Sequence, residues 1–393
     1  MLLRRLALSA LTSAALLVGL AGCDGGSGDT PPPERFHPYF VYTANSGGDD
    51  VSALEAARDG SLTFLGKAPA GSAPADIVIA GQRRFVFVAN SGDDTISVLA
   101  IGSDGRLTPK ATVPTCRTPL HLSHLRVSVD PLYVSCGGSN EVVEYAVGDD
   151  GSLDERQRFA VAGPGEVSES GSLFIPSLTD NKLYRWVREP ASPTWVPATP
   201  PSLPAGASPL KAYTNSFWTW VVNFDGASLS SYSIDIPVQG APTAAPGPTL
   251  TVGAHPVSLT FGEDSPEHNL YVVNQGIDTI SHYALASDEA ATLVSGVTID
   301  SGPNPTDITW AANWLTDFDS YIYVANSGGQ VRAYLKSQKD GSLAFLGTYE
   351  TQGNHVSALA AINDPLLLRD QAGGDMGAAG AGDMSMPAPY TVE

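Results

Sequence analysis

Basic residues are scarce in this sequence of 393 residues. It has 21 lysines and arginines against 41 aspartates and glutamates, which gives a formal net charge of −20 and a pI of about 4.5. Proteins that bind nucleic acid, or anionic lipid through a surface patch, concentrate positive charge at the contact. The composition therefore excludes nucleic acid as an expected partner and argues against membrane binding through a basic face.

Motifs of catalysis and metal binding are also missing. The chain has no Gly-x-Ser-x-Gly nucleophile motif, no His-Glu-x-x-His zinc helix and no Cys-x-x-Cys-His haem motif. His121 and His124 are three positions apart and would face opposite sides of a strand, which disfavours a shared metal ion. We predict no metal site and no cofactor, and these motifs assign no catalytic residue.

Only one long apolar run is present, at the N-terminus. Arg4 and Arg5 precede the apolar stretch 6–20, which is the arrangement of a signal peptide. Leu20-Ala21-Gly22-Cys23 follows and resembles a bacterial lipobox, in which the cysteine becomes the lipidated N-terminus. An ordinary signal peptide with a chance cysteine stays open as the alternative.

The lipobox resemblance implies a lipoprotein signal peptide over residues 1–22 and lipidation at Cys23. Residues 23–36 contain Gly, Ser and a Pro triplet and are expected to form a flexible tether. No later apolar stretch reaches the roughly 20 residues that a membrane span needs. The expected partner is therefore a membrane, contacted through the lipid anchor. The expected location is the cell envelope, facing the periplasm or the exterior.

A repeat dominates the rest of the chain. Within residues 72–113, four short strand candidates (77–79, 85–89, 95–101 and 107–113) are separated by turns rich in Gly and Asp. One such unit cannot bury both of its faces alone, so neighbouring copies must stack on one another.

Two sequence patterns, here called anchors, recur once in each repeat and give the number of repeats. A Tyr/Phe-Val-x-Asn pattern, or a variant of it, ends the second strand in seven places, including Asn45, Asn90 and Asn326. The second anchor opens the first strand two residues after a proline or its equivalent, with spacings of 45, 45, 45, 47, 49 and 50. Its seven positions are Asp76, His121, Glu166, Lys211, Ser258, Asp307 and Ser357.

Seven units of four strands predict an all-β fold, a seven-bladed β-propeller with four-stranded blades over residues 37–371. Residues 39–45 match a second strand with no first strand before it, and residues 354–361 match a first strand with no blade after it. We therefore expect the ring to close by pairing of the N-terminal and C-terminal strands. Residues 372–393 are poor in large apolar residues and are expected to form a disordered tail. A monomer is expected.

The two remaining cysteines fall in one repeat. Cys116 lies at the entry to a first strand and Cys136 ends the second strand of the same unit. Antiparallel neighbours place the start of one strand beside the end of the other, so a Cys116–Cys136 disulfide is predicted for an exported protein. Two free buried thiols remain the alternative.

Ionisable residues occupy most of the second-anchor positions. Propeller symmetry would place Asp76, His121, Glu166, Lys211 and Asp307 at one height where the central channel opens. Such a mouth could bind a small polar ligand or carry out acid–base chemistry. The alternative is that these side chains are polar because the channel is wet, and pair with one another.

The repeated Tyr-Val-x-Asn pattern and the Asp-Gly-Ser-Leu hairpins resemble YVTN-type repeats and the seven-bladed lactonase family, which includes 6-phosphogluconolactonase-like enzymes. The resemblance covers most of residues 39–362 and implies the propeller fold. It implies no catalytic residue, since the family's longer His-Pro and Asp-Leu-Gly-x-Asp stretches are missing here.

Two functions are compatible with these observations. The first is a membrane-anchored binding or interaction scaffold, not an enzyme, whose partner is an unknown protein or small molecule. The second is a lactone hydrolase of the 6-phosphogluconolactonase-like kind. The missing family stretches, the expected location outside the cytoplasm and the acidic charge favour the first.

Overall fold

The computed structural model describes residues 39–124, 131–188, 194–214, 218–235, 243–262, 268–285, 291–293, 298–312 and 320–362. The predicted signal peptide, Cys23, the tether and the tail lie outside these residues. Within the described residues, no helix has the length and apolar character needed to cross a membrane.

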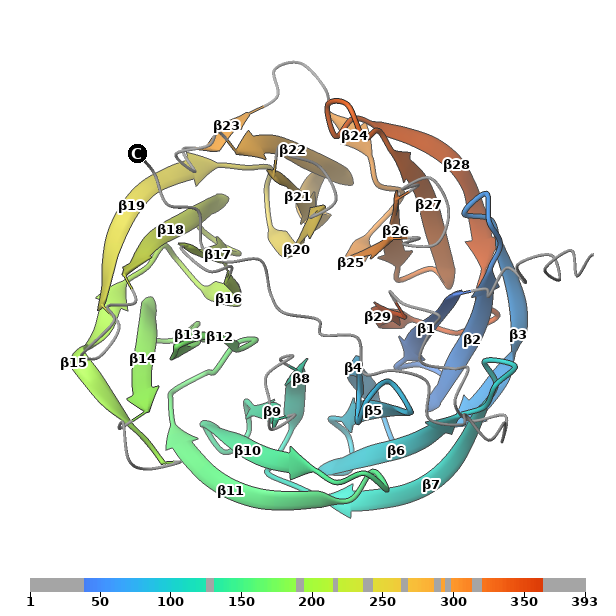
Figure 1. Cartoon of the computed structure of the whole chain (residues 1–393), viewed down its shortest axis with the longest axis horizontal. Helices are drawn as coiled ribbons and strands as arrows, with labels where there is room; N and C mark the ends of the chain where they lie inside the picture. Colours follow the sequence, from blue (N-terminus) through green and yellow to red (C-terminus); the bar gives the residue numbers. More distant parts are fainter. Residues whose placement is uncertain are drawn as a thin grey trace, which may run out of the picture. The chain divides into compact units, whose positions relative to one another are not determined.

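The chain forms seven antiparallel β-sheets arranged as blades around a central axis (Figure 1). Each blade has four strands in order from the axis to the rim, except that β23 and β24 both pair with β22 in blade six. The all-β, seven-bladed prediction is confirmed. The strands are, blade by blade, β29 (Val356–Ala361), β1 (Tyr39–Asn45), β2 (Asp50–Ala56) and β3 (Leu62–Pro69); β4 (Pro74–Ala80), β5 (Phe85–Asn90), β6 (Thr95–Ile101) and β7 (Leu107–Pro114); β8 (Pro119–His124), β9 (Pro131–Cys136), β10 (Glu141–Val147) and β11 (Leu153–Ala160); β12 (Ser168–Ser170), β13 (Ser172–Ser177), β14 (Lys182–Arg188) and β15 (Trp195–Pro204); β16 (Pro209–Thr214), β17 (Trp218–Asn223), β18 (Ser228–Asp235) and β19 (Thr243–Thr251); β20 (Pro256–Gly262), β21 (His268–Asn274), β22 (Thr279–Leu285), β23 (Ala291–Leu293) and β24 (Ile299–Asp300), with a short 3-10 helix η1 (Gln275–Ile277) after β21; and β25 (Pro305–Ala312), β26 (Ser320–Asn326), β27 (Gln330–Lys336) and β28 (Leu343–Glu350).

The ring closes as the sequence predicts. Strand β29, from the C-terminal end of the described chain, is the innermost strand of the blade that β1 begins, and the two pair in antiparallel register with Thr43 opposite Leu359. Closure by hydrogen bonding leaves no free edge between the first and last blades.

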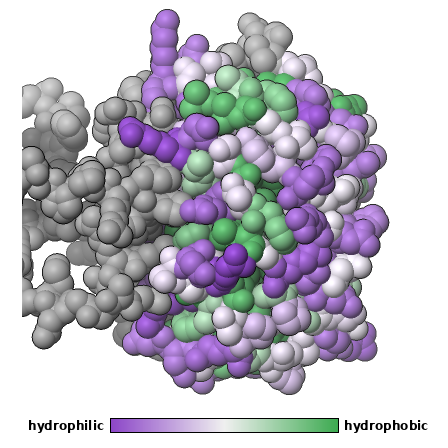
Figure 2. Space-filling model, turned by 90° about the vertical axis from the view of Figure 1, so that its right-hand side faces the viewer, coloured by the Kyte–Doolittle hydropathy of each residue, from purple (hydrophilic) through white to green (hydrophobic). Residues whose placement is uncertain are grey.

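The core lies between blades. Every residue of β1, β5 and β9 is buried, because both faces of these second strands pack against neighbouring blades. Phe40 and Tyr42 of blade one pack with Ile77 and Val86 of blade two in one such cluster. The outermost strands face solvent instead, as the mostly exposed β7 shows. The rim that faces the viewer in Figure 2 accordingly mixes hydrophilic and hydrophobic residues.

The asparagines that end the second strands have a structural role. Asn90 Nδ2 donates hydrogen bonds to Thr95 and Ser97 across the following turn, both at 2.9 Å. Asn326 instead donates to the carbonyls of Ser301 and Pro303. Its turn is one residue shorter, since Asn326 pairs with Gln330 whereas Asn90 pairs with Thr95 five positions on.

The predicted disulfide is confirmed. Cys116 and Cys136 are bonded, with a Cα–Cα distance of 5.9 Å. Cys116 precedes β8, and Cys136 ends β9 opposite Pro119, the first residue of β8. The bond therefore fastens the innermost strand of blade three at the end nearest to the channel mouth.

Candidate functional site at the channel mouth

A short backbone motif opens the innermost strands and aims one side chain at the axis. It consists of a residue with φ between 46° and 53°, then a proline in six of the seven blades, then a β-bulge or irregular step. A proline is tolerated as the first residue of a strand, and a bulge redirects the side chain that follows it. The residues with positive φ are Ala73, Thr118, Gly163, Ser208, His255, Asn304 and His355.

The preceding blade holds this motif in place. Asp49 accepts a hydrogen bond from the Ala73 N–H at 2.8 Å, and Asp94 accepts one from the Thr118 N–H at 2.7 Å. These acidic turn residues, of which Asp49 is exposed and Asp94 half-buried, are therefore bonded to the next blade. They help fix the height of Asp76 and His121 in the channel.

The motif brings all five predicted residues together. Asp76, His121, Glu166, Lys211 and Asp307 line one cavity of about 350 Å³ at the centre of the ring. A second cavity of about 230 Å³ shares four of them, all except His121. The polar cluster thus lies between two hollows on the channel axis.

Two predicted positions need correction. Ser357 is not the seventh equivalent residue, because Val356 pairs with Asn45 as Pro74 pairs with Asn90, which makes Ala358 the counterpart of Asp76. Glu166 does not lie on a strand. It precedes β12 and forms an isolated parallel bridge with Lys211 of the next blade.

Glycine permits this close approach of two blades. A Cβ on Gly165 would lie 2.1 Å from the backbone oxygen of Leu210, so only glycine fits there. The Glu166 N–H donates to that same oxygen at 2.8 Å, and the Ala212 N–H donates to the carbonyl of Glu166 at 3.1 Å. Backbone bonding between blades therefore places the Glu166 carboxylate beside Lys211.

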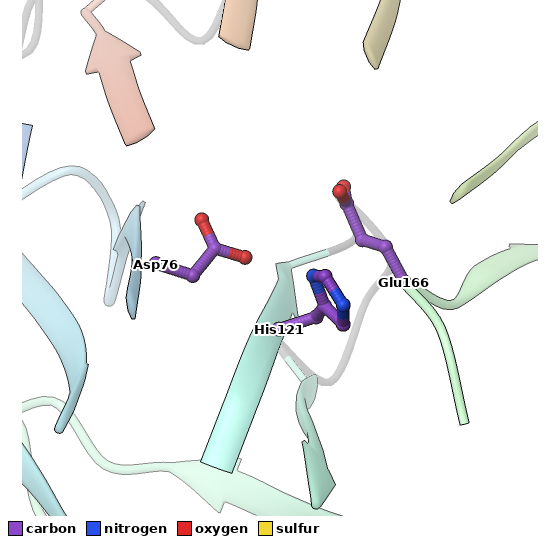
Figure 3. Close-up of side chains that lie close together, drawn as sticks. All are labelled: Asp76, His121 and Glu166. Carbon is purple, nitrogen blue, oxygen red and sulfur yellow. The ribbon is translucent and has the colours of Figure 1, made fainter. Parts of the chain in front are cut away.

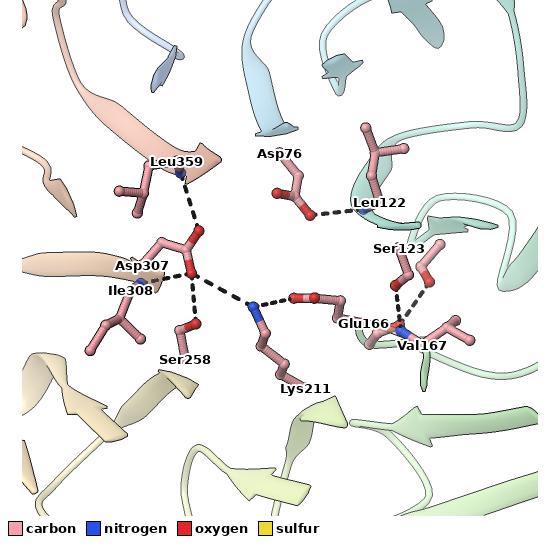
Figure 4. A network of polar contacts seen from close by, with 12 residues as sticks. Asp76, Leu122, Ser123, Glu166, Val167, Lys211, Ser258, Asp307, Ile308 and Leu359 are labelled. Atoms are coloured by element: carbon pink, nitrogen blue, oxygen red, sulfur yellow. Dashed lines mark hydrogen bonds and ion pairs between the residues drawn. The ribbon is translucent and has the colours of Figure 1, made fainter. Parts of the chain in front are cut away.

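Lys211 is the cation of the cluster (Figure 4). Its Nζ lies 2.9 Å from Glu166 Oε2 and 3.7 Å from Asp307 Oδ1. Asp307 also accepts hydrogen bonds from Ser258 Oγ at 2.6 Å and from the Leu359 N–H at 3.1 Å. The expected pairing of mouth residues with one another is thus found for these three.

Asp76 and His121 lie outside this ion-pair chain. Within the described residues, Asp76 accepts its hydrogen bonds from backbone, from the Ile77 N–H at 2.7 Å and from the Leu122 N–H at 2.8 Å. Asp76, His121 and Glu166 point toward one another from three blades, as Figure 3 shows. Their potential metal-binding atoms all lie within 4.8 Å of one another.

Burial shapes the protonation of the site. It raises the pKa of Asp76 well above the usual range, and the negative charges of Glu166 and Asp307 raise it further. Burial also raises the pKa of Glu166. Burial lowers the pKa of His121 to about 4, and the positive charge of Lys211 acts in the same direction. At neutral pH the imidazole is therefore uncharged.

Lys211 stays charged in spite of its burial. Burial alone would lower its pKa, but the carboxylates of Glu166, Asp307 and Asp76 more than offset this and the pKa is raised. The mouth thus combines carboxyl groups able to exchange protons, a neutral imidazole and a fixed positive charge. These are the groups that acid–base chemistry on an ester requires.

A second buried polar cluster was not predicted from the sequence. Tyr133 Oη lies 3.3 Å from Glu144 Oε1 and 3.1 Å from Glu169 Oε2, and Glu144 is 3.6 Å from Arg188. Glu144 also lines a cavity of about 450 Å³ between blades three and four. The available signal was a glutamate at a position of β10 where the other blades place buried residues.

Comparison with known proteins shows what part of the chain resembles. Residues 37–165 match the model of the family described as lactonase, 7-bladed beta-propeller. The matched range contains Asp76 and His121. No curated protein matches the chain. The resemblance to lactonase-type propellers is thus confirmed.

Solved structures of similar fold cover most of the chain. A putative 6-phosphogluconolactonase from Bacteroides fragilis aligns with a TM-score of 0.69 and 13% identity, over 84% of this chain and 99% of that chain. One from Bacteroides uniformis gives 0.70 and 14%, over 83% and 100%. The periplasmic gluconolactonase PpgL of Pseudomonas aeruginosa gives 0.69 and 18%, over 83% and 99%. Likeness at these identities establishes the fold.

Proposed function

Proceeding from the match of residues 37–165 to the lactonase propeller family, we propose that this protein hydrolyses a lactone at the channel mouth. The observation that carries the proposal is the cavity in which Asp76, His121, Glu166 and Lys211 converge. The family match supports this alternative better than the binding scaffold favoured on the sequence alone. A scaffold needs no neutral imidazole beside two carboxyl groups of raised pKa.

The chemistry follows from the positions of the groups. A water molecule between Asp76, His121 and Glu166 loses a proton to one of these bases as its oxygen bonds to the lactone carbonyl carbon. The bond from that carbon to the ring oxygen then breaks, and the ring oxygen takes up a proton and leaves as a hydroxyl. Lys211 supplies positive charge for the oxygen that becomes negative in the transition state.

The charge of the mouth favours an uncharged substrate. Three carboxyl groups, those of Asp76, Glu166 and Asp307, share one ammonium group, that of Lys211. The whole chain also carries a net charge of −20. Such a field repels phosphorylated sugar lactones and leaves neutral sugar lactones unaffected. The similar Pseudomonas aeruginosa protein is named as a gluconolactonase, which is consistent with a neutral lactone for this chain.

The test is a lactone-hydrolysis panel on the protein without its signal peptide. His121→Ala and Glu166→Gln should each lower turnover by roughly 100-fold to 10,000-fold, the usual size of an acid–base contribution. Glu55→Gln is the matched control, because Glu55 lies on β2, third from the axis. Unchanged turnover in both mouth variants, with circular dichroism showing intact folding, would refute a reaction at this site.

We also propose that the enzyme is anchored at a membrane through lipid on Cys23. The support is the Leu20-Ala21-Gly22-Cys23 sequence directly after an apolar run. Expression of Cys23→Ala in cells fed labelled palmitate, followed by fractionation, tests this. Loss of label and of membrane association is expected, whereas a variant that keeps both would disprove lipidation at Cys23.

A further inference from the structure

We propose that Asp76, His121 and Glu166 bind a divalent transition-metal ion at the channel mouth. The three side chains come from blades two, three and four and extend into the same part of the channel (Figure 3). One potential ligand atom from each residue, a carboxylate oxygen or an imidazole nitrogen, lies within 4.8 Å of the other two. Metal–ligand bonds are about 2.0–2.2 Å long for these atoms, so small side-chain rotations bring all three into contact with one ion.

The donor set indicates the class of metal. Two carboxylates and one imidazole suit Zn²⁺, Mn²⁺, Fe²⁺ or Co²⁺, whereas Ca²⁺ and Mg²⁺ prefer oxygen ligands alone. Three protein ligands leave at least one coordination position open, which is typical of catalytic rather than structural sites. That position would face the cavity of about 350 Å³.

The surroundings of two ligands resemble the outer shell of a metal site. Backbone N–H groups of Ile77 and Leu122 hold the two oxygens of Asp76. Lys211 contacts Oε2 of Glu166, which leaves Oε1 available to an ion. Outer-shell partners of this kind orient carboxylates and raise metal affinity.

The third ligand has no competing partner on the described residues. Among the parts of the chain that the structure describes, no hydrogen bond to the His121 ring is found. The ring lines the cavity of about 350 Å³, so either nitrogen can turn toward the two carboxylates. A histidine used only as a wet channel wall would not need to face Asp76 and Glu166 together.

The balance of charges at the mouth also favours binding of a cation. When Asp76, Glu166 and Asp307 are all ionised, Lys211 balances only one of three negative charges. A divalent ion would balance the other two. Lys211 also lies 3.7 Å from Asp307, so it can keep an anionic partner when the ion binds Glu166.

The role of such an ion rests on the proposed function, but its binding does not. Bound in this place, a divalent ion supplies Lewis-acid activation of a water molecule or of a carbonyl oxygen. Binding can be measured with no lactone present. Hydrolysis that survives complete removal of metal would exclude a catalytic role for the ion, and would leave the proposed function intact.

The experiment is isothermal titration of the chelator-treated, full-length mature protein with Zn²⁺, with Co²⁺ absorption as a second readout of coordination. We expect one saturable Zn²⁺ site per chain and a thermal midpoint of unfolding that rises with the Zn²⁺ concentration. His121→Asn should weaken binding at least as much as loss of an outer-shell partner does, about 10-fold to 100-fold. His355→Asn is its control, since His355 lines the same cavity outside the group of three.

Asp76→Asn and Asp307→Asn separate ligation from simple charge attraction. Both remove one negative charge from the mouth, but only Asp76 belongs to the group of three. If Asp76 is a ligand, Asp76→Asn should lower the affinity for Zn²⁺ by at least about tenfold. Asp307→Asn should lower the affinity less, and by an amount that depends on salt. Equal losses in the two variants, or no saturable binding by a folded wild-type protein, would overturn the proposal.

Discussion

At the residue scale, burial determines which histidines can become charged. His282, on β22, is 2% exposed, and its Nε2 lies 2.7 Å from Asn269 Oδ1. Its ring stacks on Tyr271 at a centroid distance of 4.7 Å. Burial lowers the pKa of His282 to about 4; the negative charge of Asp340 opposes this shift and the positive charge of Lys336 adds to it. Far from the mouth, the fold therefore keeps this imidazole neutral.

This predicts a pH dependence of stability. An unfolded histidine has a pKa of about 6.5, so above that pH His282 is neutral in both states and its contribution to stability is complete. As the pH falls from about 6.5 to 4, His282 binds a proton in the unfolded state before it does so in the folded state. The free energy of unfolding therefore falls by up to about 3 kcal/mol. Urea unfolding of wild type and His282→Asn between pH 7.5 and 4.5 measures it. Parallel pH curves for the two proteins would contradict the prediction.

Single residues of the site could be predicted from the sequence only where symmetry determines them. The repeat spacing placed Asp76 and Lys211 at the mouth, because equivalent positions in a ring share one height. It could not reveal which side chains meet there. The bond between Glu166 and Lys211 depends on a bridge between blades, and the approach of Asp76 to His121 depends on side-chain rotation, neither of which leaves a local pattern.

At the element scale, the approach of blade four to blade five decides the geometry of the mouth. Gly165→Ala would put a Cβ 2.1 Å from the Leu210 oxygen. The two segments must then separate, which should cost about 1–3 kcal/mol, as overpacking does in well-packed cores. Separation also moves Glu166 away from Lys211. Lactone turnover should therefore fall even at temperatures where the variant is fully folded.

Gly328→Ala is the matched control, because an added Cβ there meets no atom within 4 Å. Thermal unfolding and lactone turnover are compared for both variants. A Gly165→Ala protein that matches Gly328→Ala in both measurements would show that the close approach is unimportant.

The disulfide stabilises a different element. Cys116 and Cys136 are 20 positions apart, and closing a loop of this size in the unfolded chain contributes roughly 3 kcal/mol. In chemical unfolding, the Cys116→Ala/Cys136→Ala double variant should have a free energy of unfolding lower than that of the wild type by about this amount. Reductant should lower the free energy of unfolding of the wild type and leave that of the double variant unchanged. Equal stability of the two proteins without reductant would exclude a stabilising bond.

The strands themselves were largely predictable, since alternation and Gly-Asp turns are local signals. The misplacement of Ser357 by one residue has a local cause as well. The proline that marks the strand start in six blades is replaced by Val356 in the seventh, so the bulge that follows could not be located from composition.

At the scale of the whole molecule, ring closure couples the two ends of the chain. Strand β29 contributes the buried residues Val356, Ala358 and Leu359 to blade one. Ending the chain after residue 352 removes this strand and should cost several kcal/mol, because its apolar faces and ladder are lost. Ending it after residue 371 should cost almost nothing. Equal thermal midpoints for the two truncations would refute closure as a source of stability.

The acidity of the whole molecule and of its mouth leads to the most direct test of the proposed function. The measurement is kcat/KM of the purified wild-type protein for a neutral sugar lactone and for its phosphorylated counterpart, at low and high salt. Hydrolysis above the spontaneous rate is predicted, faster for the neutral lactone, with a gap that narrows as salt screens the charge. The absence of any hydrolysis, or a salt-independent preference for the phosphorylated lactone, would contradict it.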